Sequence, residues 1–291
     1  MRAGTVQADL CSIMKDARIS FSILLFALSG CTAVDVRPAP ASEQEVRSHA
    51  LAFGAIVNLL NHEEPCHLEY TGKDMTQESE RQLLADWWDV HNKEDLLKEL
   101  QQLIDKGHRD AFNRTHDVLR EISAPFVLPV LELGIPATTT NGTPLLEKAK
   151  DRDEFERRLV VLYFLSKNPV FVNYKPTPYL TAWDLGRYIN VCEFGFRAGY
   201  LTEPEAWDLI LPVARRIQLS FNSWEEFAQD YIMGRTYWWA SRMRQDGSEC
   251  NQVVDTLLSK NGAWDLISWN ASLGDGPIAS DPQWNKMNVR N

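Results

Sequence analysis

Apolar residues recur at helical spacing along most of the chain after about residue 42. In residues 92–107, for example, the leucine and isoleucine side chains fall on one face of a helix. We find no segment of any length in which apolar and polar residues alternate as they do in a half-buried strand. The pattern therefore predicts an all-α protein.

Short polar motifs mark where the helices begin. Ser42 with Glu45 and Thr202 with Glu205 have the spacing of capping boxes, in which a hydroxyl and a glutamate three residues later bond to each other's backbone. Thr76, Asn92 and Ser223 are further helix starts, and Gly107 suits the left-handed residue that follows a helix. The predicted helices cover residues 42–61, 76–88, 92–107, 108–122, 152–166, 181–199, a segment from 202 onward, and 223–242.

Two regions of this helical chain differ from the rest. Residues 123–150 are rich in proline and glycine, which predicts a long insertion that serves as a lid or as a connection between lobes. Residues 181–199 are apolar nearly all round the helix, so this helix is expected to be central and buried. We therefore expect residues 42–291 to form a compact multi-helix domain with a long insertion around 123–150.

The first 41 residues follow another pattern. A basic flank precedes an apolar run over residues 19–28, and the motif Leu-Ser-Gly-Cys ends at Cys31, which has the form of a bacterial lipobox. The apolar run is too short to cross a bilayer, because a membrane-spanning helix needs about 20 residues. We predict a signal peptide over residues 1–30, translated from Met14, with a lipid attached to Cys31.

The residues after Cys31 predict where the protein is held. Residues 31–41 are polar with two prolines, which suits a tether. Stable anchoring needs more than one acyl chain, and bacterial lipoproteins resemble that solution with a lipidated, acylated N-terminal cysteine. Thr32, rather than an aspartate, follows the cysteine, which by resemblance to known sorting rules favours the outer membrane. We expect an outer-membrane lipoprotein that faces the periplasm.

Charge and tryptophan content narrow the range of partners. Residues 1–30 hold three of the 30 basic and two of the 40 acidic residues, so the mature chain keeps 27 and 38, a net charge of −11. Such a chain is a poor partner for nucleic acid or for anionic lipid headgroups. The ten tryptophans indicate core packing or, less often, a carbohydrate- or peptide-binding surface.

The remaining cysteines and the histidines give little sign of special chemistry. Cys192 lies on an apolar stripe, which leaves Cys66 and Cys250 as a candidate disulfide pair whose formation stays open. His62, Cys66 and His67 do not have zinc-site spacing, so we expect no metal site. The sequence also lacks the common cofactor and nucleophile motifs, and we expect no cofactor.

The block from residue 180 to 242 carries an ordered series of tryptophan, acidic, glycine and arginine motifs. They read Ala182-Trp183-Asp184-Leu185-Gly186-Arg187, Gly199-Tyr200-Leu201-Thr202-Glu203 leading to Glu205-Ala206-Trp207, Ser223-Trp224-Glu225-Glu226, and Tyr231-Ile232-Met233-Gly234-Arg235 followed by Trp238. Upstream stand Trp88, Leu96-Leu97, Gly107-His108-Arg109 and Phe112. Together they resemble the bacterial family known as domain of unknown function 1266 over residues 83–240. The resemblance implies an α-helical bacterial domain and no established activity.

This block also predicts a polar cluster among aromatic rings. Arg235 falls on the apolar stripe of its helix, and a buried charge must be paired or stacked. Asp184 and Arg187 stand three residues apart on the helix that we expect to be buried. The predicted cluster consists of Asp184, Arg187, Glu205 and Arg235, walled by Trp183, Trp207, Trp224 and Trp238.

Two interpretations of this cluster remain open. It is a pocket for an anionic group or an acid–base pair, or it is a buried salt-bridge network that sets helix register, which we favour. Our first hypothesis for the protein is a lipid-anchored binding module that meets another envelope protein or an effector. The alternative is an envelope hydrolase acting on a glycan or peptide, with Asp184, Glu205 or Glu193 as acid and base. The sequence does not decide whether the protein is an enzyme.

Overall fold

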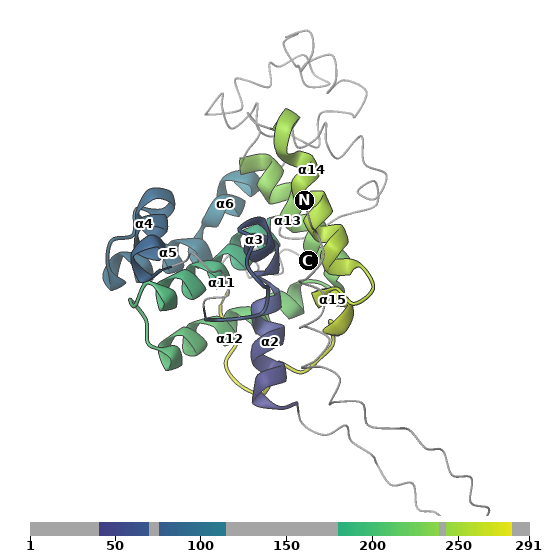
Figure 1. The fold of residues 1–291 in the computed structure, drawn as a ribbon, viewed down its shortest axis with the longest axis horizontal. Helices are drawn as coiled ribbons and strands as arrows, with labels where there is room; N and C mark the ends of the chain where they lie inside the picture. Colours follow the sequence, from purple (N-terminus) through teal and green to yellow (C-terminus); the bar gives the residue numbers. More distant parts are fainter. Residues whose placement is uncertain (1–40, 70–75, 115–179, 239–242, 281–291) are drawn as a thin grey trace, which may run out of the picture. The chain divides into compact units, whose positions relative to one another are not determined.

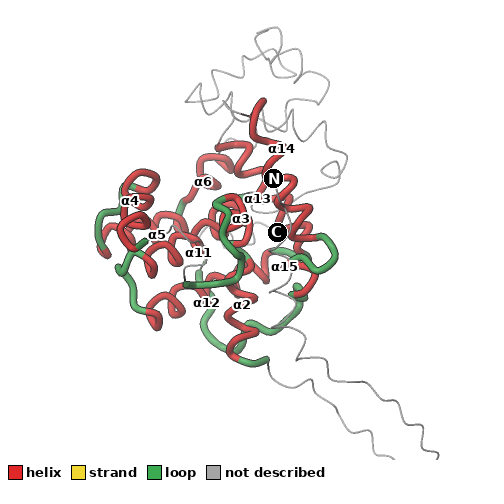
Figure 2. The backbone as a smooth tube through the Cα atoms, in the orientation of Figure 1, coloured by secondary structure: helices red, strands yellow, loops and turns green. Residues whose placement is uncertain are grey.

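A computed structural model describes residues 41–69, 76–114, 180–238 and 243–280. Within these ranges every regular element is a helix, as Figure 2 shows, which confirms the all-α prediction. The described helices belong to one unit, Pro40–Asn291. The predicted signal peptide and lipobox, the helix at 152–166 and the insertion at 123–150 lie outside the described residues.

The N-terminal part contains two short helices where the sequence predicted one. Helix α2 spans Glu43–Ala52 and helix α3 spans Ala55–Leu60, so the prediction of one helix over 42–61 is wrong. The break falls at Gly54, whose carbonyl accepts a hydrogen bond from Asn190 Nδ2 at 3.0 Å. A Cβ atom at Gly54 would lie only 2.7 Å from that nitrogen. The helix is therefore interrupted where the central helix approaches its backbone.

The next three helices follow the predicted start signals. Helix α4 spans Gln77–Trp88 and is capped by Thr76, and helix α5 spans Lys93–Asp105 and is capped by Asn92. Helix α6, Gly107–Arg114, begins at a glycine with a φ of +53°. The left-handed conformation expected of Gly107 is thus present, at the start of α6 rather than directly after the last residue of α5.

Helix α11, Thr181–Arg197, is the central element. All of its seventeen residues except Phe196 are buried, as the nearly all-round apolar pattern predicted. It contacts α3, α4, α5, α6, α12 and α13 (Figure 1). Helix α12 spans Glu203–Ser220 and starts at the predicted capping box of Thr202 and Glu205, and helix α13 spans Trp224–Trp238.

The last two helices were not predicted from the sequence. Helix α14 spans Met243–Leu258 and packs on α3 and α13, and helix α15 spans Ala263–Leu266. Trp264 of α15 stacks on Trp224 with ring centroids 5.0 Å apart, and Trp269 meets the same ring edge-on at 4.9 Å. Among the described helices, none has both the length and the apolar composition needed to span a bilayer.

Candidate functional site

Asp184, in the first turn of α11, is the centre of the best-connected polar site. Its side chain is fully buried. Its Oδ1 atom accepts a hydrogen bond from the His108 backbone N–H at 3.0 Å, and its Oδ2 atom accepts one from the Arg109 backbone N–H at 2.9 Å. Both amides lie at the start of α6, where helix N–H groups lack partners and the helix dipole favours a negative charge. Asp184 therefore caps α6 from another helix.

Two arginines complete the surroundings of this carboxylate. Arg109 Nη1 lies 3.0 Å from Oδ2, and Arg187 Nη2 lies 2.9 Å from Oδ1. Arg109 is fully buried and also donates to the backbone carbonyls of Leu103 and Ile104, at the end of α5. Each Asp184 oxygen thus accepts two hydrogen bonds, which uses the lone pairs of the carboxylate. This arrangement ties α5, α6 and α11 together.

Gly107 is required for the close approach of α6 to Asp184. A Cβ atom built on Gly107 would lie 2.0 Å from Asp184 Oδ2. Its φ of +53° is also a conformation that residues with side chains rarely adopt. The tripeptide Gly107-His108-Arg109 therefore surrounds Asp184. Gly107 leaves room for the carboxylate, and the backbone N–H groups of His108 and Arg109 and the Arg109 guanidinium donate to it.

Arg187 joins this centre to a group of indole rings. Its guanidinium carbon lies 4.2 Å from the ring centroid of Trp183 and 5.3 Å from that of Trp88. The Nε atom donates to the Trp183 carbonyl at 3.1 Å, so the plane of the group is held in one orientation. The side chain is 10% exposed, and burial lowers the pKa of Arg187 against the opposing effect of Asp184.

His108 is held in one tautomer by its neighbours. Its Nδ1 atom accepts from Trp183 Nε1 at 2.9 Å and lies 3.1 Å from Arg187 Nη2. Indole and guanidinium groups only donate, so Nδ1 carries no proton and the neutral ring carries its proton on Nε2. The side chain is 35% exposed. The Nδ1 atom of His108 is therefore occupied by donors and is not available as a general base.

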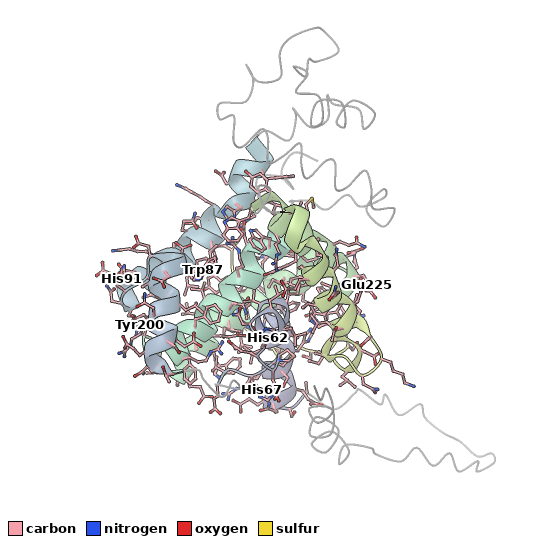
Figure 3. All side chains as sticks on the ribbon, turned by 45° about the horizontal axis from the view of Figure 1, so that its top comes forward. His62, His67, Trp87, His91, Tyr200 and Glu225 are labelled. Atoms are coloured by element: carbon pink, nitrogen blue, oxygen red, sulfur yellow. The ribbon has the colours of Figure 1, made fainter. Side chains whose placement is uncertain are left out.

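The indole rings continue from this site to the surface. Trp183 lies 5.9 Å from Trp238, and Trp238 lies 6.5 Å from Trp87, centroid to centroid. Trp87, at the end of α4, is 64% exposed, which is unusual for so large an apolar ring. Figure 3 shows Trp87 on the same side as His91 and Tyr200, with Glu225 on the other side. We call Trp87, Trp88, Trp183, Trp238, Arg187 and His108 the tryptophan–arginine surface.

The structure brings together only part of the predicted cluster. Asp184, Arg187, Trp183 and Trp238 belong to one site, as described above. Glu205 is a surface residue: it accepts from Lys93 Nζ at 2.6 Å and from the Thr202 backbone at 3.0 Å. These bonds lower the pKa of Glu205 to about 2. A carboxylate so stabilised is unsuited to donate a proton near neutral pH.

Trp207 and Trp224, which were predicted to line the polar cluster, lie elsewhere in the structure. Trp207 donates to Glu203 at 3.1 Å, and the Arg47 guanidinium lies 4.7 Å above its ring. Trp224 belongs to the aromatic core around Trp264 and donates to the Ile267 carbonyl at 2.7 Å. Both residues pack elements of the fold rather than line the Asp184 site.

The buried arginine that accompanies Arg187 is Arg109, which the sequence analysis did not select. Arg235, predicted for that role, is half-buried and lies against Cys250, where it opposes the effect of burial that raises the pKa of the thiol. The signal for Arg109 was its place in the Gly107-His108-Arg109 motif. Glu193 is fully buried in a second polar cluster near the other end of α11.

The cysteines and metal-binding residue types form no further site in the part of the chain that the structure describes. Cys66, Cys192 and Cys250 are all free thiols, so the candidate pair Cys66–Cys250 is not a disulfide here. No group of three histidine, cysteine or acidic side chains among these residues is arranged to hold a metal ion.

Comparison with known proteins gives a family. Residues 83–269 match the family described as "Protein of unknown function (DUF1266)", which includes Trp88, Gly107-His108-Arg109 and the α11 motif. The chain is also similar to the uncharacterized protein YbeU of Escherichia coli strain K12, with 22% identity over 207 residues, which cover 71% of this chain and 77% of that protein. No solved structure matches the chain. The family pattern covers more than half of the sequence, so this protein belongs to the DUF1266 family.

Proposed function

We propose that this protein is a lipid-anchored binding module of the bacterial cell envelope, held in the outer membrane through Cys31 and facing the periplasm. We further propose that it binds another envelope protein through the tryptophan–arginine surface. The observation that supports the binding role is the environment of the Arg187 guanidinium. Its guanidinium lies against the two indole rings of Trp88 and Trp183 and is almost wholly buried, yet Nη1 takes part in no hydrogen bond within the described residues.

The chemistry of this surface favours a protein partner that presents a carboxylate. A guanidinium held in a fixed plane is preorganised to grip a carboxylate oxygen, because little side-chain entropy is lost on binding. The exposed ring of Trp87 offers apolar area beside it. Tryptophan and arginine are also the residue types that most often dominate protein interfaces. We therefore expect an aspartate, a glutamate or a chain terminus of the partner at Arg187.

The hydrolase alternative receives no comparable support from the geometry. Both oxygens of Asp184 are occupied, and the residue is inaccessible to a substrate. The bonds from Lys93 and Thr202 keep Glu205 in its charged form. A glycosidase needs one carboxylic acid and one carboxylate facing an open cleft, and these two residues do not supply such a pair.

The binding role can be tested by capture from envelope extracts. The wild-type chain and a Trp87→Ala variant are cross-linked in cells, and the captured proteins are quantified by mass spectrometry. We expect Trp87→Ala to reduce recovery of the specific partner by about tenfold or more, as for a central interface residue. Leu219→Ala is the matched control, since Leu219 is another large apolar residue, 60% exposed, on α12. Equal recovery with Trp87→Ala and Leu219→Ala would refute the proposed surface.

The anchor is tested separately. Cys31→Ser should give a protein that carries no lipid and no longer fractionates with membranes, while radiolabelled palmitate should label the wild type. Absence of label on the wild-type chain would refute the lipobox assignment. In a strain that cannot process the signal peptide, N-terminal peptides should begin at Met14.

A further inference from the structure

A second buried cluster of charged side chains lies toward the end of α11. Arg197 is surrounded by three carboxylates: it pairs with Glu63, which follows α3, and lies 3.5 Å from Glu80 of α4 and 3.7 Å from Glu193 of α11. All four side chains are at most 3% exposed. We call Glu63, Glu80, Glu193 and Arg197 the glutamate cluster.

Several oxygen atoms of the glutamate cluster have no hydrogen-bond donor within the described residues. They are both carboxyl oxygens of Glu80 and one each of Glu63 and Glu193. Two buried amides face the cluster: Asn190 Nδ2 donates to Asn58 Oδ1 at 2.8 Å and lies 3.4 Å from Glu193 Oε2. Asn190 Oδ1 lacks a partner as well, while hydrogen bonding from Asn58 and Asn190 lowers the pKa of Glu193 against the larger effect of burial. Ionised carboxylates require donors at such sites, whereas carboxylic acids bring their own.

The charges of the cluster do not balance unless protons are bound. Among the residues that the structure describes, three carboxylates and one guanidinium leave two negative charges in excess, and each uncompensated buried charge costs several kcal/mol. Burial raises the pKa of Glu80 to about 7 and that of Glu193 to about 8, although Arg197 acts in the opposite direction. The neighbouring thiols of Cys66 and Cys192 add no charge, because burial and Glu193 raise the pKa of both.

The cluster also holds α4 against α11, and α4 carries two of the six residues of the tryptophan–arginine surface. Glu80 lies near the start of α4, and Arg81 beside it donates to the Ala198 carbonyl at 2.9 Å. Trp87 and Trp88 form the end of the same helix, where Trp88 packs on Arg187. Helix α4 is therefore attached to α11 near both of its ends.

We propose that the glutamate cluster is a two-proton site and that loss of these protons releases α4, which dismantles the tryptophan–arginine surface. Each carboxylic acid gives one proton to water and becomes a carboxylate. The two like charges created beside Glu63 then repel one another in a site with one guanidinium. This makes partner binding depend on pH, a consequence that rests on the proposed function, whereas the release of α4 does not.

The direction of the pH effect follows from proton binding in the two states. In the unfolded chain both glutamates lose their protons near their ordinary pKa of about 4.5, while the folded chain keeps them up to about 7 and 8. The stabilisation is full below the ordinary pKa and is lost as the pH rises through the folded-state values. Attachment of α4 is accordingly expected to weaken between about pH 6 and about pH 9.

Hydrogen exchange of the full chain in detergent micelles tests the release of α4. After correction for intrinsic rates, we expect protection of Gln77–Trp88 to fall by about tenfold or more between about pH 6 and about pH 9, relative to α12. In the double variant Glu80→Gln, Glu193→Gln, the amides imitate the acids and the fall should vanish. Glu78→Gln is the matched control, since Glu78 lies on the same helix with its side chain 82% exposed.

The outcomes separate this inference from the proposed function. Unchanged protection of α4 in the wild type, or an equal fall in the double variant, overturns the two-proton site. If the double variant does not fold, infrared absorption of protonated carboxyl groups decides: the band must be present at about pH 6 and lost at about pH 9, and Glu80→Gln alone must weaken it, because Asp230, whose pKa burial also raises to about 7, contributes to the same band. An effect of pH on α4 without any effect of Trp87→Ala on capture would instead overturn the proposed function alone.

Discussion

The two ends of α11 bury carboxylates in opposite ways. At the N-terminal end Asp184 receives two backbone N–H groups and two arginines. Toward the C-terminal end three glutamates share Arg197, and several of their oxygens have no donor within the described residues. Burial is essentially complete in both sites. Opposing arginines as well as donors separate the two sites, because Asp230 accepts two backbone N–H bonds and burial still raises its pKa to about 7.

This difference predicts opposite changes in stability when a carboxylate of each site is replaced by a neutral amide: a loss at Asp184 and a gain at Glu193. Asp184→Asn leaves Arg109 and Arg187 without a counter-charge in a buried site, which typically costs about 3 to 5 kcal/mol. We expect this loss in urea denaturation at neutral and alkaline pH alike. Asp86→Asn, at an exposed position on α4, is the control and should change stability by less than about 0.5 kcal/mol. A loss similar to that of the control would show that Asp184 is not the structural centre.

The buried base His49 should make stability depend on pH in the opposite direction to the glutamate cluster. His49 is packed between Phe53 and Trp224, and burial lowers its pKa to about 4 against a small opposing effect of the Ala271 carbonyl. The unfolded chain binds a proton below about pH 6.5 while the folded chain does not, so stability is lost as the pH falls from 6.5 to 4. The full effect is about 3 kcal/mol. His49→Phe should flatten this part of the stability–pH curve, and an unchanged slope would contradict the assignment.

Gly107 allows the approach of α6 to Asp184 to be tested without touching a charge. Gly107→Ala places a methyl group against the carboxylate in addition to straining a left-handed residue, and should cost about 2 to 4 kcal/mol. Gly274→Ala is the control, because Gly274 also has a positive φ but its Cβ would meet no atom closer than 3.8 Å. The control should cost only about 1 to 2 kcal/mol. Equal losses in thermal denaturation would mean that the close approach is unimportant.

Glu193→Gln should have the smallest effect, and its sign should depend on pH. Above about pH 8 it removes an unbalanced charge and is expected to stabilise the protein by about 1 kcal/mol. At about pH 4 the side chain is neutral in both the folded and the unfolded wild-type chain, so little change is expected. Melting temperatures at the two pH values provide the measurement. Glu225→Gln, at an exposed position on α13 (Figure 3), should show no such difference.

Local signals in the sequence determined the helical class and most helix starts. The capping residues Ser42, Thr76, Asn92 and Thr202 all act within three residues of themselves, so their effect can be read from the chain. The same reasoning failed at Gly54, where Asn190 interrupts the helix from 136 positions away. Helix α14 was missed because the helix predicted over residues 223–242 runs up to its first residue and no glycine or proline separates the two.

The sequence by itself also determined that Asp184 and Arg187 are neighbours, because residues three apart on a helix share a face. Only the tertiary structure decided that Arg109 completes the pair, that Trp88 clamps Arg187, and that Glu205 lies at the surface. It alone gathered Glu63, Glu80 and Glu193 around one arginine. Helix periodicity is a property of adjacent residues, whereas the balance of charges in a buried site depends on which distant segments pack together.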